Sequence, residues 1–208
     1  MKLNFLLAMK IKSNRRRNGF TLVELLVVIT IIAVLAGAGF AAGNAAIQKA
    51  KKTTALATCI AIESAVNNFY TEYGSMPSEI TDDNPSPLQT NSPDGLKLVK
   101  VLLGTDDAAS LLLNPRQIKF LSVKEGKGKK GGLIYDKTGV NIDGLFDPWG
   151  GPFNVVLDGN YDEKVKVKPT GSSSDVTLNG RRAGVWSEGA DGVEKSSKSK
   201  TTDDVKTW

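Results

Sequence analysis

The sequence contains no histidine and only one cysteine, Cys59. Without histidine the chain cannot build a Ser-His-Asp triad, a Cys-His pair or a histidine-ligated zinc site. A single cysteine cannot form a disulfide within the chain. These absences leave an enzyme only carboxylate or Ser-Lys chemistry, and we do not expect enzymatic activity.

Charged side chains are missing from Leu25 to Gln48, and acidic ones are missing from residues 1–19. A membrane-spanning helix needs about 20 apolar residues, so the uncharged run is long enough to cross a bilayer. The basic residues ahead of it account for the formal charge of +5. Because positive charge marks the cytoplasmic flank of a spanning helix, we place residues 1–19 in the cytoplasm and those after about Gly43 outside.

Glu24 is the acidic residue at the head of this uncharged run. A carboxylate within a bilayer costs about 2.5–3.5 kcal/mol at a helix centre, so it is expected to have a partner and a function. The simpler alternative is an acid that interacts with the positive end of the helix dipole.

An ordinary secretory signal is a competing interpretation of the N-terminus. Ala36-Gly37-Ala38 satisfies the small-residue rule for signal cleavage, which would release a soluble protein beginning near Gly39. Such a signal requires neither Glu24 nor the Gly19-Phe20 junction.

The helix is predicted to continue beyond the apolar run, because Gln48 to Tyr73 lacks proline and glycine. Gly74 then predicts a C-cap, and Pro77 forbids continuation. The apolar residues spaced for one face of this part of the helix are Ile62, Val66, Phe69, Tyr70 and Tyr73.

The rest of the chain mixes short elements. We expect residues 75–95 to form a loop and residues 96–113 to form short helical segments. Residues 118–123 are expected to form a strand. Residues 124–132 are basic and glycine-rich but lack aromatic residues for base stacking, so we expect a solvated turn and no nucleic-acid partner. Three further strands are predicted over 153–157, 164–168 and 182–187, the first two flanking a turn.

The stretch Arg15-Arg16-Arg17-Asn18-Gly19-Phe20-Thr21-Leu22-Val23-Glu24 resembles the type IV prepilin signature. The resemblance implies that prepilin peptidase cleaves after Gly19, that the new amine of Phe20 is methylated, and that subunits assemble into a filament. In that filament Glu24 would pair with the Phe20 amine of a neighbouring subunit.

Three further segments resemble the major, G-type pseudopilin of type II secretion systems. They are 73–77, the turn at Asp147-Pro148-Trp149-Gly150, and the pair formed by 186–192 and 203–208. The resemblance implies an α+β, type IV pilin-like fold, with a long N-terminal helix packed on a small antiparallel sheet. The predicted division is a leader (1–19), a spanning or filament-core helix (20–47) and a periplasmic domain (48–208). The periplasmic domain comprises the second half of the helix (48–73), a variable region (74–145) and the sheet with the C-terminal loop (146–208).

The same family binds calcium in its C-terminal loop. Carried onto this sequence, the ligands would be Asp191 and Asp204, with Asp203 possible and Ser187 or Glu188 nearby. Calcium takes six to eight oxygen ligands, so aspartates in a loop suit it. Lysines 195, 198 and 200 lie between these acids and oppose a cation. The alternative is a solvated tail with Trp208 docked on the domain.

The sequence therefore predicts a subunit of a type II secretion pseudopilus in the bacterial inner membrane. Implied partners are further copies of the chain, prepilin peptidase, minor pseudopilins, and the platform protein and ATPase of the secretion system. Alternatives are a type IV pilus pilin, a secreted carboxylate enzyme, or a calcium-dependent adhesion module on one helix.

Overall fold

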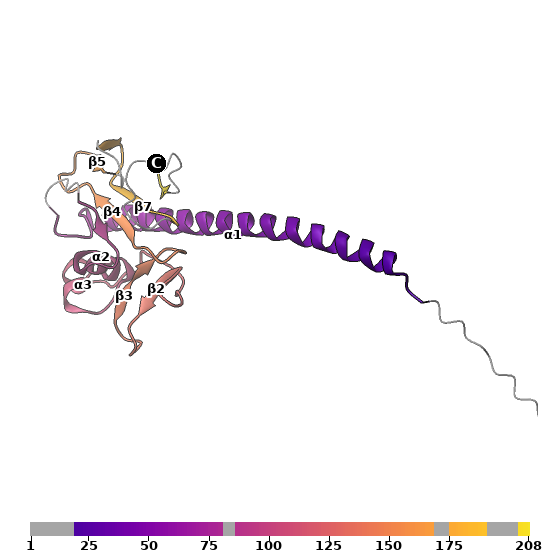
Figure 1. Ribbon diagram of the computed structural model, residues 1–208. Helices are drawn as coiled ribbons and strands as arrows, with labels where there is room; N and C mark the ends of the chain where they lie inside the picture. Colours follow the sequence, from indigo (N-terminus) through magenta and orange to yellow (C-terminus); the bar gives the residue numbers. More distant parts are fainter. Residues whose placement is uncertain (1–18, 81–85, 169–174, 191–203) are drawn as a thin grey trace, which may run out of the picture. The chain divides into compact units, whose positions relative to one another are not determined.

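A computed structural model of the chain describes residues 19–80, 86–168, 175–190 and 204–208 (Figure 1). The chain divides into two compact units, Met1–Ala45 and Ala46–Trp208. The cleaved leader and the periplasmic location of residues 48–208 stay predictions.

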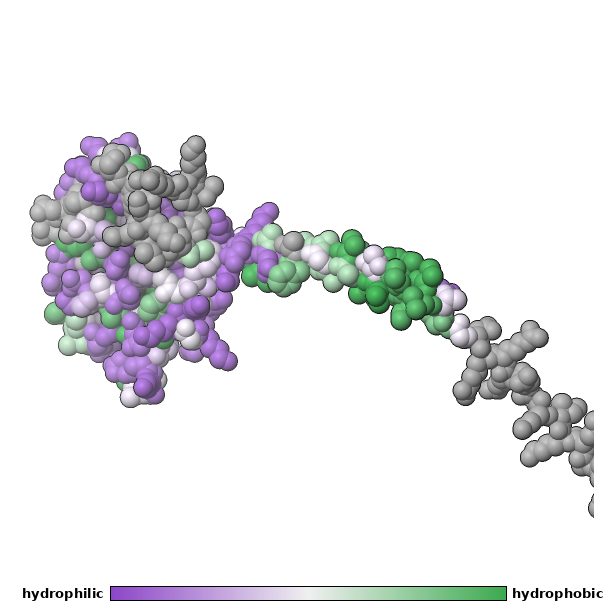
Figure 2. Space-filling model, viewed as in Figure 1, coloured by the Kyte–Doolittle hydropathy of each residue, from purple (hydrophilic) through white to green (hydrophobic). Residues whose placement is uncertain are grey.

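The first unit contains the start of helix α1 (Leu22–Tyr73). Within the described residues, α1 is the one helix that is long and apolar enough to cross a membrane, with a mean hydropathy of 2.7 over its most apolar stretch. Its large apolar side chains are exposed, from Leu22 to Phe40. They form the green stretch in Figure 2.

In the second unit, α1 supplies one wall of the hydrophobic core. Ile62, Val66 and Phe69 are buried, and Tyr70 and Tyr73 pack against the same core, so the predicted apolar face is confirmed. The helix ends at Tyr73, where Gly74 adopts a φ of +69° and donates its N–H to the Tyr70 carbonyl. A left-handed residue at this position is the usual helix terminator.

The main sheet is antiparallel with the strand order β1-β4-β7-β8. Its strands are β1 (Leu88–Gln89), β4 (Phe153–Leu157), β7 (Ala183–Ser187) and β8 (Val205–Lys206). Every residue of β4 and β7 is buried, and Val155 pairs with Val185 at the centre. The predicted strands over 153–157 and 182–187 are therefore the two central strands of this sheet.

Two smaller antiparallel pairs complete the strands. One pair is β2 (Gly132–Tyr135) with β3 (Ile142–Phe146), and the other is β5 (Lys164–Val167) with β6 (Val176–Asn179). The valines of β5 are buried and its lysines exposed, as the alternation predicted. β4 and β5 flank a turn as expected, but they do not pair with each other: β4 pairs with β1 and β7, and β5 pairs with β6.

The predicted helical segments are α2 (Pro93–Leu103) and α3 (Ala108–Leu113). Ser92 and Asp107 cap their N-termini by accepting backbone N–H groups, of Gly95 and Ser110 respectively. Together with α1 and the antiparallel sheets, these helices give an α+β fold consistent with the type IV pilin-like fold (Figure 1).

One predicted strand, 118–123, is wrong. Phe120 and Leu121 both donate their backbone N–H groups to the Leu102 carbonyl at the end of α2, at 2.9 and 2.8 Å. The Asn114 side chain also bonds both backbone groups of Ile118. The backbone groups of Ile118, Phe120 and Leu121 are thus satisfied by the end of α2 and by one side chain instead of by a neighbouring strand.

Candidate functional site

Helix α1 begins with a reciprocal pair of hydrogen bonds between Thr21 and Glu24. The Thr21 N–H and hydroxyl both donate to Glu24 Oε2, at 2.9 and 2.8 Å. The Glu24 N–H in turn donates to Thr21 Oγ1, at 3.2 Å. This arrangement is a capping box, which satisfies backbone donors that a helix start otherwise leaves unpaired.

The predicted cleavage junction lies just ahead of this helix start. Gly19 and Phe20 belong to neither a helix nor a strand, and the Phe20 side chain is 78% exposed. A Cβ added at Gly19 would meet nothing within 4 Å. Among the described residues, therefore, no neighbour requires a glycine at this position.

A second cluster of interest is the turn between β3 and β4. The buried Asp147 accepts the backbone N–H groups of Trp149, Gly150 and Gly151 through Oδ1, at 2.7–2.9 Å. Its Oδ2 accepts the Ser187 hydroxyl at 2.6 Å. The four bonds make the Asp147 carboxylate the centre of the turn.

The same turn is fastened to α1 through its tryptophan. Trp149 Nε1 donates to Gln48 Oε1 at 3.1 Å. Gly150 has a φ of +108°, a conformation that side chains other than glycine rarely adopt. The predicted structural turn, Asp147-Pro148-Trp149-Gly150, is thus present and joins α1, the β3–β4 connection and β7.

The proposed calcium ligands are only partly within the described residues, because Asp191 and Asp203 lie outside them. Asp204 faces Lys206 across 3.9 Å. The buried Ser187 hydroxyl donates to Asp147 and accepts from the Gly189 N–H, so a cation would compete with that N–H for its lone pairs. Among the residues described, no group of three or more acidic or cysteine side chains is arranged so that it could hold a metal ion.

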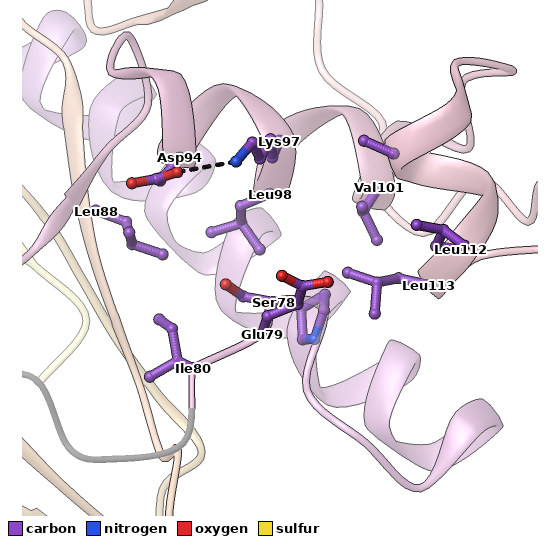
Figure 3. A pocket seen from close by; sticks show the side chains of 12 residues that line it. Ser78, Glu79, Ile80, Leu88, Asp94, Lys97, Leu98, Val101, Leu112 and Leu113 are labelled. Atoms are coloured by element: carbon purple, nitrogen blue, oxygen red, sulfur yellow. Dashed lines mark hydrogen bonds and ion pairs between the residues drawn. The ribbon is translucent and has the colours of Figure 1, made fainter.

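The variable region 74–145 contains a hollow of about 330 Å³ that has aliphatic walls and also includes Ser78 and Glu79 in its lining (Figure 3). An Asp94–Lys97 ion pair of 3.2 Å lies at its edge. The lining is mostly aliphatic, which suits an apolar side chain better than a reacting group. Its apolar walls include Ile80, Leu88, Leu98, Val101, Leu112 and Leu113.

The N-terminal geometry has a counterpart among known families. Residues 14–40 match the family model of the prokaryotic N-terminal methylation motif. Neither the curated proteins nor the solved structures gave a match to this chain.

The matched stretch contains the exposed Gly19-Phe20 junction, the Thr21–Glu24 capping box and most of the uncharged helix. These features define the class of membrane-associated precursors that carry a methylation motif. The chain has the N-terminus of a type IV prepilin-like protein, and this class indicates a structural protein.

Sequence reasoning found Glu24 and the Asp147 turn but not the partners of either. Thr-x-x-Glu directly before an apolar run is itself a capping-box signature, so Thr21 could have been identified. Ser187 lies 40 residues from Asp147, and no local pattern connects the two.

Proposed function

We propose that this chain is a structural subunit of a type II secretion pseudopilus. Prepilin peptidase removes residues 1–19, Phe20 is methylated, and the processed subunits polymerise through α1. The observation that carries this proposal is a methylation motif that ends in an apolar helix with one acid, Glu24, at its head.

Glu24 acts at two stages in this proposal. In the precursor, Thr21 provides an intramolecular partner for the carboxylate, and both of its bonds use Oε2. Oε1 can then accept the new Phe20 amine of an adjacent subunit. A buried charge pair of this kind fixes register more than it adds stability, so it would stop each incoming subunit at one height.

The glycines of the apolar helix support assembly between copies of the chain. Glycine inside a helix costs about 1 kcal/mol relative to alanine. A Cβ added at Gly37, Gly39 or Gly43 would meet nothing within 4 Å, so the chain's own packing does not explain them. Close approach of a neighbouring helix does, because small residues let helix backbones come together.

The Asp147 turn supports a subunit of a type II secretion pseudopilus over a pilin of a type IV surface pilus. Its Asp-Pro-Trp-Gly segment resembles that of the major pseudopilin, and the Ser187 bond links it to the second resembling segment. In this function the domain lies in the periplasm. The platform protein, the assembly ATPase and minor pseudopilins act on the filament.

Calcium binding is a separate proposal within this function. The ion would be held by Asp191, Asp203 and Asp204, with Ser187 contributing only if it gives up its bond from Gly189. We expect calcium to raise the melting temperature of the domain and a chelator to reverse the effect. Asp191→Asn together with Asp204→Asn should abolish the shift, whereas the exposed Asp175→Asn should leave it.

The testing experiment is mass spectrometry of the N-terminal peptide from cells that contain prepilin peptidase. A peptide that starts at N-methylated Phe20 supports the proposal, and one that starts near Gly39 contradicts it. Deleting the gene tests whether the filament is a secretion pseudopilus or a surface pilus. Loss of export of folded proteins with surface pili retained supports the pseudopilus, and the opposite result supports a pilus pilin.

A further inference from the structure

Lysines gather around α1 where it enters the second unit. Lys49, Lys51 and Lys52 directly follow the uncharged run, and Lys49 and Lys52 are exposed. On the helix itself the next acidic residue is Glu63, which pairs with Arg181 at 2.8 Å. The charged side chains on the first turns of α1 in this unit are therefore all basic.

The basic turn 124–132 lies beside the same turns of the helix. Its Gly131 donates to the Asp147 carbonyl at 2.7 Å. A Cβ at Gly150 would lie 3.3 Å from both the Lys129 carbonyl oxygen and Lys130 Cγ. Since the neighbouring Trp149 bonds to Gln48, the turn that carries the exposed Lys129 and Lys130 is connected to α1 one residue before Lys49.

Two open hollows on α1 bring in further lysines. One, of about 320 Å³, is lined by Lys49, Lys52 and Lys206, together with Asp204. The other, of about 370 Å³, is lined by Thr53, Thr54 and Lys124. We name the whole set the lysine collar; it consists of Lys49, Lys51, Lys52, Lys124, Lys129, Lys130 and Lys206.

Carboxylates near the lysine collar offset only part of its charge. Asp204 faces Lys206, and only 11% of its side chain is exposed. Asp147 is buried with both oxygens occupied by donors. Glu125 is exposed beside Lys124 and offsets one charge. Outside the N-terminal leader the chain is nearly neutral, so the collar concentrates charge locally.

We propose that the lysine collar binds the anionic headgroups of the membrane in which the subunit is anchored. This inference rests on the proposed function only for the anchoring of residues 25–47 in a bilayer. A spanning segment that ends near Gln48 places Lys49 to Lys52 at the headgroup level. Clustered lysines beside a spanning helix attract anionic lipid within a Debye length of the surface. Contact with phosphates would hold the domain on the membrane until the subunit is extracted.

The experiment uses the full chain in nanodiscs of phosphatidylcholine alone or with about 30% phosphatidylglycerol, an amount that gives a strongly anionic surface. Each lysine is labelled with an amine-reactive acetyl ester and read out by peptide mass spectrometry. We expect labelling of Lys49, Lys52, Lys129 and Lys130 to slow about threefold on the anionic nanodiscs. About 0.5 M NaCl should remove the difference by screening. The exposed Lys97 and Lys164 are internal references.

Matched variants test the same point. Lys129→Gln with Lys130→Gln alters only the turn, and should remove the protection of Lys49 at least in part. Lys164→Gln with Lys166→Gln on β5 removes the same charge and should leave that protection intact. Unchanged thermal unfolding of both variants shows that the fold is retained.

Equal labelling on neutral and anionic nanodiscs would overturn the proposal. Protection by a single-stranded oligonucleotide without protection by phosphatidylglycerol would also overturn it, because the occupant would then be nucleic acid. Flotation with phosphatidylcholine vesicles separates the two proposals. If the chain floats but its lysines are labelled equally on both nanodiscs, only headgroup binding by the lysine collar is rejected. If the chain does not float, both the membrane anchor and headgroup binding by the collar are rejected.

Discussion

The Ser187 hydroxyl donates a 2.6 Å hydrogen bond to Asp147 Oδ2, and both residues are buried. This bond ties the end of β7 to the start of the β3–β4 turn. Cys59 is buried and free, so no disulfide holds these elements together. A bond to a charged acceptor is the stronger kind, and here it fastens the C-terminal part of the domain.

Asp147→Ala should destabilise the domain by about 3 kcal/mol. It leaves a buried hydroxyl and three turn N–H groups without their acceptor, and a buried polar group left unpaired costs about 1–3 kcal/mol. The three turn N–H groups are partly exposed and regain water, so most of the loss comes from the buried Ser187 hydroxyl. Urea unfolding followed by circular dichroism measures the loss.

Asp143→Ala is the matched control, because Asp143 is exposed on the adjacent strand β3. It should change stability by no more than about 0.5 kcal/mol. Ser187→Ala should cost about 2 kcal/mol, less than Asp147→Ala, since the three turn bonds remain. Equal losses in Asp147→Ala and Asp143→Ala would contradict the central role of the Asp147 carboxylate.

Glu24→Ala should leave leader cleavage intact and abolish filament assembly, because the neighbouring Phe20 amine loses its partner. Thr21→Val isolates the pairing role, since it removes the side-chain half of the capping box but keeps the carboxylate. We expect Thr21→Val to assemble and to lose about 1 kcal/mol of helix stability. Immunoblots of cleaved precursor and sheared filaments provide both readouts.

The two roles of Glu24 predict different results for this pair of variants. If Glu24 served only as a helix cap, Thr21→Val and Glu24→Ala would fail to assemble alike. Normal filament yield from Glu24→Ala would reject the pairing with the Phe20 amine.

Asp136 should titrate below the usual range for an aspartate. The Thr138 hydroxyl, 2.6 Å from Oδ1, and then the Asn141 amide, 2.9 Å from Oδ2, hold the pKa of this carboxyl down. Because the pKa is depressed, the ionised carboxyl stabilises the β2–β3 turn. This stabilisation is fully present when the pH is above the ordinary aspartate pKa of about 3.9. That stability is lost as the pH falls through the folded-state pKa.

Carbon-13 NMR of the Asp136 carboxyl as a function of pH measures this shift directly. Thr138→Ala should move the midpoint back toward the ordinary value, whereas Thr177→Ala on β6 should not. A midpoint at the ordinary value in the unsubstituted chain would show that the turn bonds do not persist in solution.

Cys59 should be almost unreactive toward thiol reagents in the folded chain. Burial, with a smaller effect of the Asp147 charge, raises the pKa of its thiol to about 12. The thiol also lies against β8, with Sγ 3.9 Å from the Val205 carbonyl oxygen. Val205→Asp should loosen β8 and speed the reaction with a disulfide reagent at least about tenfold, because reaction requires access and thiolate.

Val140→Asp is the control for the Cys59 experiment, since Val140 is 76% exposed on the β2–β3 turn. It should leave the reaction rate of Cys59 unchanged. Rapid reaction of the unsubstituted folded chain would mean that β8 does not cover the thiol.

Local signals in the sequence predicted much of the fold. Gly74 ended α1 because a left-handed residue stops a helix, and the lysine-valine alternation of β5 gave one exposed and one buried face. The acid at the head of the apolar run marked the N-terminal motif, which the methylation family model matches.

Long-range pairing was beyond such signals. Residues 118–123 are rich in apolar residues like a strand but bond to the end of α2, and β4 pairs with β7 across an intervening hairpin. The same reason hid the Asp147–Ser187 bond, whose two residues meet only when the main sheet forms. Local periodicity constrains which face of a segment is buried but not which partner buries it.

The position of β8 sets an order in time for the making of this protein. Val205 is added to the growing chain after every element it covers, including Cys59 on α1 and Ser187 on β7. The sheet therefore cannot close while residue 205 is still in the ribosome. A growing chain that has completed β7 but not yet β8 therefore still has its core open along one edge.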